Sequence, residues 1–217
     1  MLGENLIIGE EFRKVASQLN SLILKEVNGV LVVTIAGESG SGKSGIAAAL
    51  EEKLNHSKVK TLIIQQDDYF LLPPKTNEGK RRKDISWVGV KEVNLELLQY
   101  HIDMIREGKD FIKPLVLFDE DKIVEEKVSV SGVKVVIVEG TYTSLLENVD
   151  KKIFIDRIYT ETKKERMIKA REIQDEFLEK VLEIEHRIIS EHKSKADVVI
   201  TNSFKIIEIS RNCITPY

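Results

Sequence analysis

The chain has 217 residues, of which 42% are hydrophobic, so it is long enough for one α/β domain with a buried core. Its 33 basic and 36 acidic residues leave a net charge of −3, which argues against a nucleic-acid partner because such binding needs a basic face. No apolar run approaches the roughly 20 residues that span a bilayer, and the N-terminal residues lack the pattern of a secretory signal. With one cysteine, Cys213, and hence no internal disulfide, the protein is expected to be cytoplasmic, with no membrane partner.

The first part of the chain alternates helical and extended patterns. Apolar residues at helical spacing predict an amphipathic helix over residues 10–24, inside an N-terminal helical extension that spans 1–28. This helix is a candidate surface for a second chain, so a homo-oligomer stays open. Buried strands are then predicted at 30–36 and 61–64, with a helix over 46–54 between them.

The middle of the chain begins with a loop rich in Pro, Lys and Arg, predicted over 71–87. A helical pattern follows over 90–106, and β-formers mixed with charges over 114–130 predict a short hairpin. Two apolar runs, at 133–138 and 153–155, predict further buried strands.

The last part of the chain carries a long helical pattern from 162 to 193, within a lid region expected at about 160–193. A final core strand is predicted at 198–200. Strands that alternate with helices, and that are nearly continuous in β-branched residues, predict an α/β fold with a parallel sheet and helices on both faces.

The most informative motif is Gly-Glu-Ser-Gly-Ser-Gly-Lys-Ser at residues 37–44, which matches G-x-x-x-x-G-K-[ST] between a predicted strand and a predicted helix. Its glycines let backbone N–H groups turn toward a phosphate chain, and the following helix offers its positive end to the same anion. Lys43 is expected to reach the β- and γ-phosphates, and Ser44 to place its hydroxyl on Mg²⁺. The predicted ATP-binding residues are Gly37, Glu38, Ser39, Gly40, Ser41, Gly42, Lys43, Ser44 and Gly45.

Acidic residues follow two of the predicted strands, at the rim where ligands bind in parallel sheets. Asp67 or Asp68 can accept the proton of an acceptor hydroxyl, or hold Mg²⁺ through water. Because neighbouring side chains leave a strand on opposite faces, these two carboxylates are not expected to share one role. Glu139 stands where an acidic Mg²⁺ ligand is expected, together with Ser44.

Aromatic side chains near the same rim are candidates for binding the acceptor. Tyr69, Phe70 and Trp87 can each stack on a flat substrate, or anchor the core or a loop. The basic run at 80–83 is either solvated or in contact with an anion.

Basic residues at the start of the long helix are candidates for binding the transferring phosphoryl group. Arg166 and Arg171 can close over it, since arginine matches phosphate geometry well, while Lys169 is a weaker candidate. His186 and His192 are six residues apart, which is not the spacing of a helical metal pair, so both are expected to pack or to lie on the surface.

Three further pieces accompany the phosphate loop: Gln-Asp-Asp-Tyr-Phe at 66–70, Val-Glu-Gly at 138–140 and Lys-Ala-Asp-Val-Val-Ile at 195–200. Together with the basic helix start at 166–171, their order and spacing resemble the uridine kinase and phosphoribulokinase group of P-loop kinases, over roughly residues 30–200.

This resemblance implies a nucleoside-monophosphate-kinase-like P-loop fold, with a kinase domain at 29–210, a small helical lid and a tail at 211–217. It implies transfer of a phosphoryl group from Mg-ATP to a hydroxyl of a small-molecule substrate. The acceptor that it favours is a nucleoside such as uridine or cytidine. In that group the residue matching Asp67 is the catalytic base, and the residue matching Glu139 serves the metal.

The resemblance also implies that aromatic residues near Tyr69 and Phe70 line the acceptor site, and that Arg166 and Arg171 meet the phosphates. Residues 85–90 lack the Asp-His-Pro sequence of typical uridine kinases, so pantothenate, sugar phosphates and glycerate stay open as acceptors. Residues 172–176 stand in place of the lid's Arg-Gly-Arg, which keeps an ATP-binding regulatory module as a rival. A switch GTPase is disfavoured, because the guanine-reading motif Asn-Lys-x-Asp does not occur in the sequence.

Overall fold

A six-stranded sheet forms the centre of the computed structural model, which describes residues 8–169 and 175–209. The strand order is β2-β5-β1-β6-β7-β8; β8 joins the edge antiparallel and the other neighbours pair in parallel. The strands are β1 (Leu31–Gly37), β2 (Thr61–Gln65), β5 (Val135–Gly140), β6 (Lys151–Ile155), β7 (Val198–Ile200) and β8 (Ile206–Glu208). The predicted parallel α/β fold is confirmed, and the carboxyl ends of the parallel strands share one rim.

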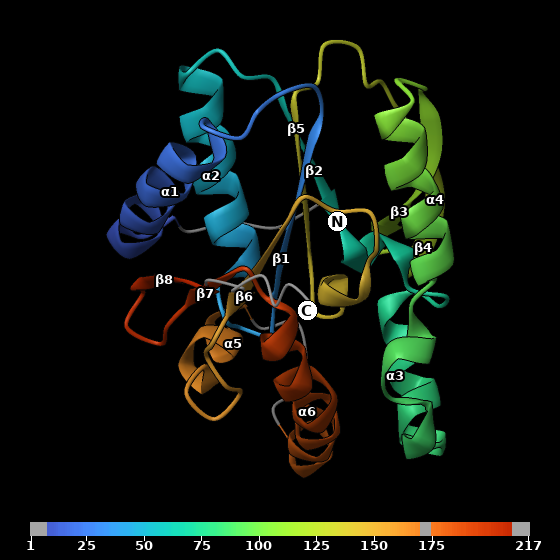
Figure 1. Ribbon diagram of the computed structural model, residues 1–217. Helices are drawn as coiled ribbons and strands as arrows, with labels where there is room; N and C mark the ends of the chain where they lie inside the picture. The colour runs from blue at the N-terminus through green and yellow to red at the C-terminus, as the bar shows by residue number, and fades with distance from the viewer. Residues whose placement is uncertain (1–7, 170–174, 210–217) are drawn as a thin grey trace, which may run out of the picture.

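Helices cover both faces of this sheet because the central strands are buried on both sides. Helices α1 (Glu10–Ile23) and α2 (Lys43–His56) lie on one face, and α4 (Leu95–Arg106) lies on the other (Figure 1). The side chains of β1 alternate between the two layers: Val33 and Ile35 pack under α1 and α2, whereas Val32 packs in the layer of α4. The hairpin of β3 (Phe111–Leu117) and β4 (Lys122–Val128), predicted from sequence, extends that second layer.

The N-terminal helix α1 belongs to the same core as the sheet. Its apolar residues Val15, Ala16, Leu19 and Ile23 have no exposed surface and pack with α2 and the central strands. The apolar stripe that was a candidate surface for a second chain is therefore covered by the protein's own α2 and sheet.

Helix α3 (Pro74–Lys83) replaces the loop that the sequence predicted over 71–87. Proline at the first helical position is favourable, and Asp121, from the β3–β4 turn, caps the helix by accepting from the backbone N–H groups of Lys75 and Thr76. The prediction of a loop was wrong because the interactions that stabilise this short polar helix come from distant parts of the chain. Three short 3-10 helices flank it, η1 (Gln66–Tyr69), η2 (Ile85–Trp87) and η3 (Val90–Glu92). The helix predicted over 90–106 thus begins later, at Leu95, because its first residues form η3.

The long helix predicted over 162–193 is two helices, α5 (Lys163–Lys169) and α6 (Glu176–Ile189), and residues 170–174 lie outside the described part of the chain. Asp175 is the N-cap residue of α6, because its carboxylate accepts a hydrogen bond from the backbone N–H of Leu178 at 2.9 Å. Further 3-10 turns are η4 (Thr143–Leu145) and η5 (Ser190–Lys195). In Figure 1, α3 and α6 lie beyond the carboxyl ends of the strands, on either side of the rim.

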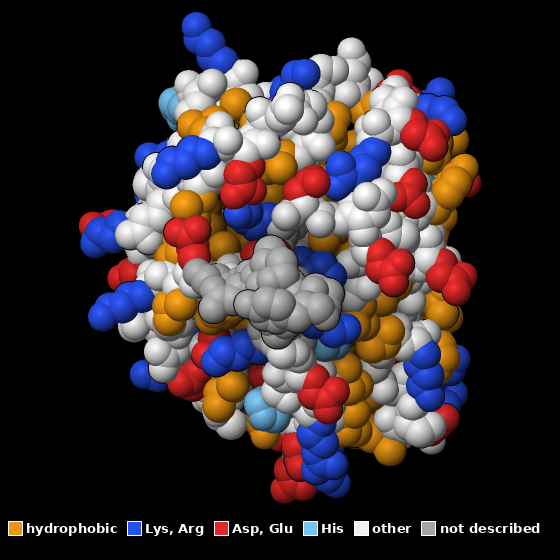
Figure 2. Space-filling view, viewed as in Figure 1, with side chains coloured by type: hydrophobic (Ala, Val, Ile, Leu, Met, Phe, Trp, Pro, Cys, Tyr) orange, Lys and Arg blue, Asp and Glu red, His pale blue; other side chains and the backbone are white. Residues whose placement is uncertain are grey.

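On the face shown in Figure 2, basic and acidic side chains are intermingled over the surface. None of the described helices is long and apolar enough to cross a membrane.

Candidate functional site

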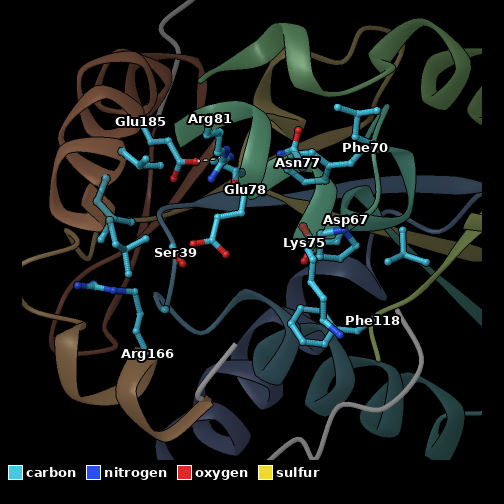
Figure 3. A pocket seen from close by; sticks show the side chains of 18 of the residues that line it. Ser39, Asp67, Phe70, Lys75, Asn77, Glu78, Arg81, Phe118, Arg166 and Glu185 are labelled. Atoms are coloured by element: carbon cyan, nitrogen blue, oxygen red, sulfur yellow. Dashed lines mark hydrogen bonds and ion pairs between the residues drawn. The ribbon is translucent and has the colours of Figure 1, made fainter. Parts of the chain in front are cut away.

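A cavity of about 200 Å³ lies at the rim of the sheet and joins residues that are far apart in sequence. The phosphate loop contributes Ser39, Gly40, Lys43 and Ser44. The other walls come from the ends of β2 and β5, from α3, from the β3–β4 hairpin and from α5 and α6 (Figure 3). The lining residues outside the phosphate loop are Asp67, Phe70, Leu72, Pro74, Lys75, Asn77, Glu78, Arg81, Val116, Phe118, Glu139, Thr141, Arg166, Leu178, Val181, Leu182 and Glu185.

The phosphate loop has the left-handed turns that its glycines permit. Gly40 has φ +75° and Gly42 has φ +105°, and α2 begins at the next residue, Lys43. The loop therefore presents its backbone at the positive end of α2, which is the arrangement that binds an anion. The Lys43 ammonium donates a hydrogen bond to the Glu38 carbonyl at 3.0 Å, so this lysine lies along the loop.

Other loop residues face away from the cavity. Ser41 is fully buried, and the Glu38 carboxylate accepts from the backbone N–H of Tyr159 and contacts Nδ1 of His186, both at 2.6 Å. Glu38 and His186, which the sequence did not connect, thus tie the phosphate loop to the β6–α5 segment and to α6.

Helix α1 packs against the loop from outside. A Cβ atom at Gly45 would lie 2.5 Å from the Phe12 ring, and one at Gly42 would lie 2.9 Å from it. Phe12 in turn packs edge-on against Phe204, after β7, with 5.4 Å between ring centroids. A side chain at either position would therefore have to displace the Phe12 ring, and Gly42 also has the positive φ that glycine favours.

Ser44 and Glu139 form the pair expected for a magnesium site. The Ser44 hydroxyl donates to Oε1 of Glu139 at 3.0 Å, and Glu139 is only 4% exposed. Mg²⁺ prefers oxygen ligands and is usually held in kinases by one or two carboxylates together with substrate phosphates. The chemistry of this hydroxyl–carboxylate pair, next to the phosphate loop, fits that ion.

Asp67 and Asp68 have separate environments, although both lie in the 3-10 helix η1 and not on a strand, as the sequence reasoning had assumed. Asp67 lines the cavity. Asp68 is buried beneath it, where its carboxylate accepts from the Lys113 ammonium at 2.7 Å and from the backbone N–H of Val116 at 3.0 Å. Asp67 thus faces the site, while Asp68 fixes the hairpin strand β3 to the sheet.

Arg166 lines the cavity from α5, and its stem lies against the phosphate loop. A Cβ atom at Gly40 would be 2.9 Å from Cγ of Arg166. The guanidinium donates through Nη1 to the Tyr159 carbonyl and the Thr162 hydroxyl, whereas Nε and Nη2 are buried with no hydrogen-bond partner among the described residues. Buried unpaired donors beside an anion-binding loop fit a phosphate ligand, because burying them unpaired is unfavourable. Arg171 lies outside the described residues, as does the side chain of Lys169.

The three aromatic candidates differ in position. Phe70 lines the cavity. Tyr69 does not, because it is 1% exposed and its hydroxyl bonds Nδ1 of His101 at 2.9 Å; burial, with the nearby Asp68 charge, raises the pKa of Tyr69. Trp87 lies behind the wall, where its indole N–H donates to Asn77 Oδ1 at 2.9 Å and the Lys80 ammonium covers its ring. Tyr69 and Trp87 are not among the residues that line the cavity, which favours the alternative that they anchor the core and a loop.

The basic run at 80–83 is neither wholly solvated nor directed as a group at the cavity. Only Arg81 lines it, and Arg81 is ion-paired with Glu92 and Glu185. Arg82 pairs with Glu78 and with Asp175.

Sequence reasoning missed the residues that α3 and α6 contribute to the cavity. The signal that was available is helical spacing, since residues 74, 77, 78 and 81 share one face of α3, and residues 178, 181, 182 and 185 share one face of α6. With 71–87 read as a loop, the first of these faces could not be recognised.

The model of the phosphoribulokinase/uridine kinase family matches residues 32–202, and the chain therefore belongs to this family. A uridine kinase from Mycoplasma pneumoniae is 28% identical over 199 residues, which cover 85% of this chain and 90% of that protein. A bifunctional alpha-galactosidase/sucrose kinase from Mediterraneibacter gnavus is 25% identical over 82% of this chain, which spans 21% of that longer protein.

Among solved structures, one described as a possible uridine kinase from Bacillus stearothermophilus superposes with a TM-score of 0.64. It covers 87% of this chain and 98% of its own, at 19% identity. That likeness supports the P-loop kinase fold, and membership of the family makes the protein a kinase acting on small molecules.

Proposed function

We propose that this protein transfers the γ-phosphoryl group of Mg-ATP to a hydroxyl group of a small metabolite, and that a nucleoside such as uridine or cytidine is its acceptor. The observation that carries the proposal is the meeting of the phosphate loop, the Ser44–Glu139 pair and Asp67 in one cavity. Family membership supports the kinase chemistry. The choice of a nucleoside is supported by the Mycoplasma pneumoniae relative, a uridine kinase at 28% identity, and it is part of the proposal.

Each residue has a role that its position supports. The backbone of the phosphate loop and Lys43 bind the β- and γ-phosphates, and Ser44 and Glu139 would hold Mg²⁺. When bound, this ion neutralises negative charge on the phosphates. Asp67 accepts the proton of the attacking hydroxyl, as a carboxylate lining the cavity can do.

Arg166 supplies positive charge on the lid side of the cavity. Its buried Nε and Nη2 donors are available to a phosphate oxygen, and a fixed cation of this kind stabilises the charge that develops during transfer. Leu178, Val181 and Leu182 of α6 close the same side and reduce the access of water to the reacting phosphate.

The test is acceptor-dependent release of ADP from Mg-ATP by the full-length protein. Uridine, cytidine, a hexose and a disaccharide are compared with a control without acceptor, and mass spectrometry identifies the phosphorylated product. Release with a nucleoside supports the proposal, and release only with a sugar keeps the kinase but replaces the acceptor. ATP binding without transfer to any tested acceptor would contradict the proposal and favour a nucleotide-binding regulatory module.

A further inference from the structure

Glu38 is the second residue of the phosphate loop, yet its side chain does not line the cavity. This side chain is only 5% exposed, and each carboxylate oxygen has its own partner. Oε2 accepts from the backbone N–H of Tyr159, and Oε1 contacts Nδ1 of His186, both at 2.6 Å. Because a carboxylate accepts hydrogen bonds, Nδ1 of His186 is the donor in this contact. One loop side chain therefore holds two segments that lie 121 and 148 residues further along the chain.

The first of these segments leads to Arg166. The backbone N–H of Tyr159 donates to Glu38, and the carbonyl of Tyr159 accepts from Nη1 of Arg166. The same Nη1 donates to the Thr162 hydroxyl, which donates in turn to the Ser39 carbonyl in the phosphate loop at 2.9 Å. These bonds fix one end of the guanidinium and leave Nε and Nη2, which have no partner among the described residues, available to a phosphate oxygen.

The second segment is α6. His186 lies next to Glu185, which lines the cavity together with three apolar residues of the same helix. Figure 3 shows Glu185 and Arg166 on the same side of the cavity. We call the part of the cavity that α3, the β3–β4 hairpin and α6 line the acceptor half. The contact between His186 and Glu38 thus joins one wall of the acceptor half to the phosphate loop.

The two contacts of Glu38 are suited to holding reacting groups in place. Phosphoryl transfer is catalysed mainly by positioning and by electrostatic stabilisation, and the groups that act must be held within about 0.5 Å of their productive position. The Arg166 side chain is long and flexible, so the Tyr159 carbonyl that fixes its Nη1 end limits where its free donors lie. Glu38 fixes that peptide group in turn, from within the loop that binds the phosphates.

We propose that Glu38 is a positioning residue for phosphoryl transfer. Through Tyr159 it sets the guanidinium of Arg166 beside the phosphate loop, and through His186 it sets the α6 wall of the acceptor half against the same loop. The inference rests on the proposed kinase activity. It concerns the rate of transfer more than the binding of ATP, because the Glu38 side chain does not line the cavity.

The first experiment compares two substitutions of Glu38 in the full-length protein. Glu38→Ala removes both contacts. Glu38→Gln can keep them, since its amide oxygen can accept from Tyr159 and its amide nitrogen can donate to the other tautomer of His186. We expect Glu38→Ala to lower kcat by about tenfold or more with KM for ATP changed less than about threefold, and Glu38→Gln to retain at least about a third of kcat.

Four outcomes of this comparison would overturn the inference. Three of them leave the kinase proposal intact: wild-type kcat in a folded Glu38→Ala protein, a loss confined to KM for ATP, and a kcat of Glu38→Gln as low as that of Glu38→Ala. Absence of turnover by the wild-type protein with every acceptor would overturn both proposals. Circular dichroism establishes that the variants are folded.

The second experiment tests whether Glu38 acts through Arg166. In an Arg166→Met background, Glu38→Ala should lower kcat by less than about a further threefold, because the guanidinium that it positions is already absent. The full tenfold loss in both backgrounds would show that the effects are independent and would overturn the inference.

The third experiment leaves the phosphate loop unchanged, and it decides the matter if Glu38→Ala does not fold. His186→Ala removes the donor from α6, and we expect it to lower kcat/KM for the acceptor by about fivefold or more. His186→Asn should restore most of this loss, because its amide can donate in place of Nδ1. Arg187→Ala is the matched control at the next, exposed position of α6 and should change kcat/KM less than about twofold. Equal values for His186→Ala and Arg187→Ala would overturn the inference.

Discussion

The two halves of the cavity are built in different ways. The phosphate half, made of the loop at 37–44 with Glu139, uses backbone groups and a few side chains fixed by neighbouring strands of one sheet. The acceptor half uses side chains from α3, the β3–β4 hairpin and α6, which are brought together only by tertiary contacts. The phosphate half therefore depends mainly on one continuous segment of the chain, whereas the acceptor half depends on contacts between distant segments.

The adjacent residues Asp67 and Asp68 give the strongest test of this division. Asp67→Asn should lower kcat by about 10²- to 10⁴-fold, because it removes the proposed proton acceptor, while leaving Mg-ATP affinity nearly unchanged. Asp68→Asn should instead lower the free energy of unfolding by about 1–3 kcal/mol, because it weakens a buried ion pair with Lys113. Steady-state kinetics, ATP titration calorimetry and urea unfolding measure these effects. Full activity in Asp67→Asn would remove Asp67 as the base.

The side of the phosphate half formed by α5 is tested at Arg166. Arg166→Met keeps the apolar stem against Gly40 but removes the guanidinium, and we expect kcat to fall by about 10²-fold because a transition-state charge contact is lost. Arg187→Met, at an exposed position on α6, is the control and should leave kcat unchanged within about twofold. Similar kcat values for the two variants would mean that Arg166 serves only to hold the loop.

The contact between α1 and the phosphate loop predicts that Gly45→Ala has opposite effects on stability in the presence and in the absence of the Phe12 ring. Gly45→Ala should destabilise the protein, because the new Cβ would lie 2.5 Å from Phe12. In a Phe12→Ala background the same substitution should stabilise it by about 0.5–1 kcal/mol, since alanine is favoured over glycine within a helix. Chemical unfolding of the four proteins in a double-mutant cycle measures this coupling. Additive effects would show that Phe12 does not restrict Gly45.

The smallest expected effect is a pH dependence of stability from two buried histidines outside the cavity. Burial lowers the pKa of His101, with the Lys113 charge adding to the effect, and burial together with the nearby Lys195 charge lowers the pKa of His192. The unfolded chain therefore binds protons that the folded protein does not, so stability is retained above pH about 6.5 and declines as the pH falls below it.

Urea unfolding at pH 5.5 and pH 8 measures this decline in the free energy of unfolding. In His192→Asn the decline should be smaller by about 0.5–1 kcal/mol. An identical pH profile for wild type and His192→Asn would exclude His192 as a contributor.

The sequence alone determined most of the sheet and the phosphate half. The strands at 30–36, 61–64, 133–138, 153–155 and 198–200 were recognised because each is a short apolar run, and the central strands β1 and β5 are buried on both faces. The phosphate loop was recognised because its chemistry needs glycine and lysine at fixed positions in one continuous segment. The separate environments of Asp67 and Asp68 were expected from alternation along a strand, but the structure produces them within the 3-10 helix η1.

Only the tertiary structure decided the acceptor half. Helix α3 is stabilised by a cap from Asp121, 46 residues after Lys75 in sequence, and by the bond of Arg81 to the buried Glu92. Tyr69 was expected at the substrate but packs with His101 in the core, because its direction is set by α4 and the hairpin. The ion pair of Arg81 with Glu185 joins residues 104 positions apart. Local sequence patterns predict helices and strands from propensity and periodicity. The charge that surrounds a substrate depends on which distant side chains lie in the same buried space, and local patterns do not predict this.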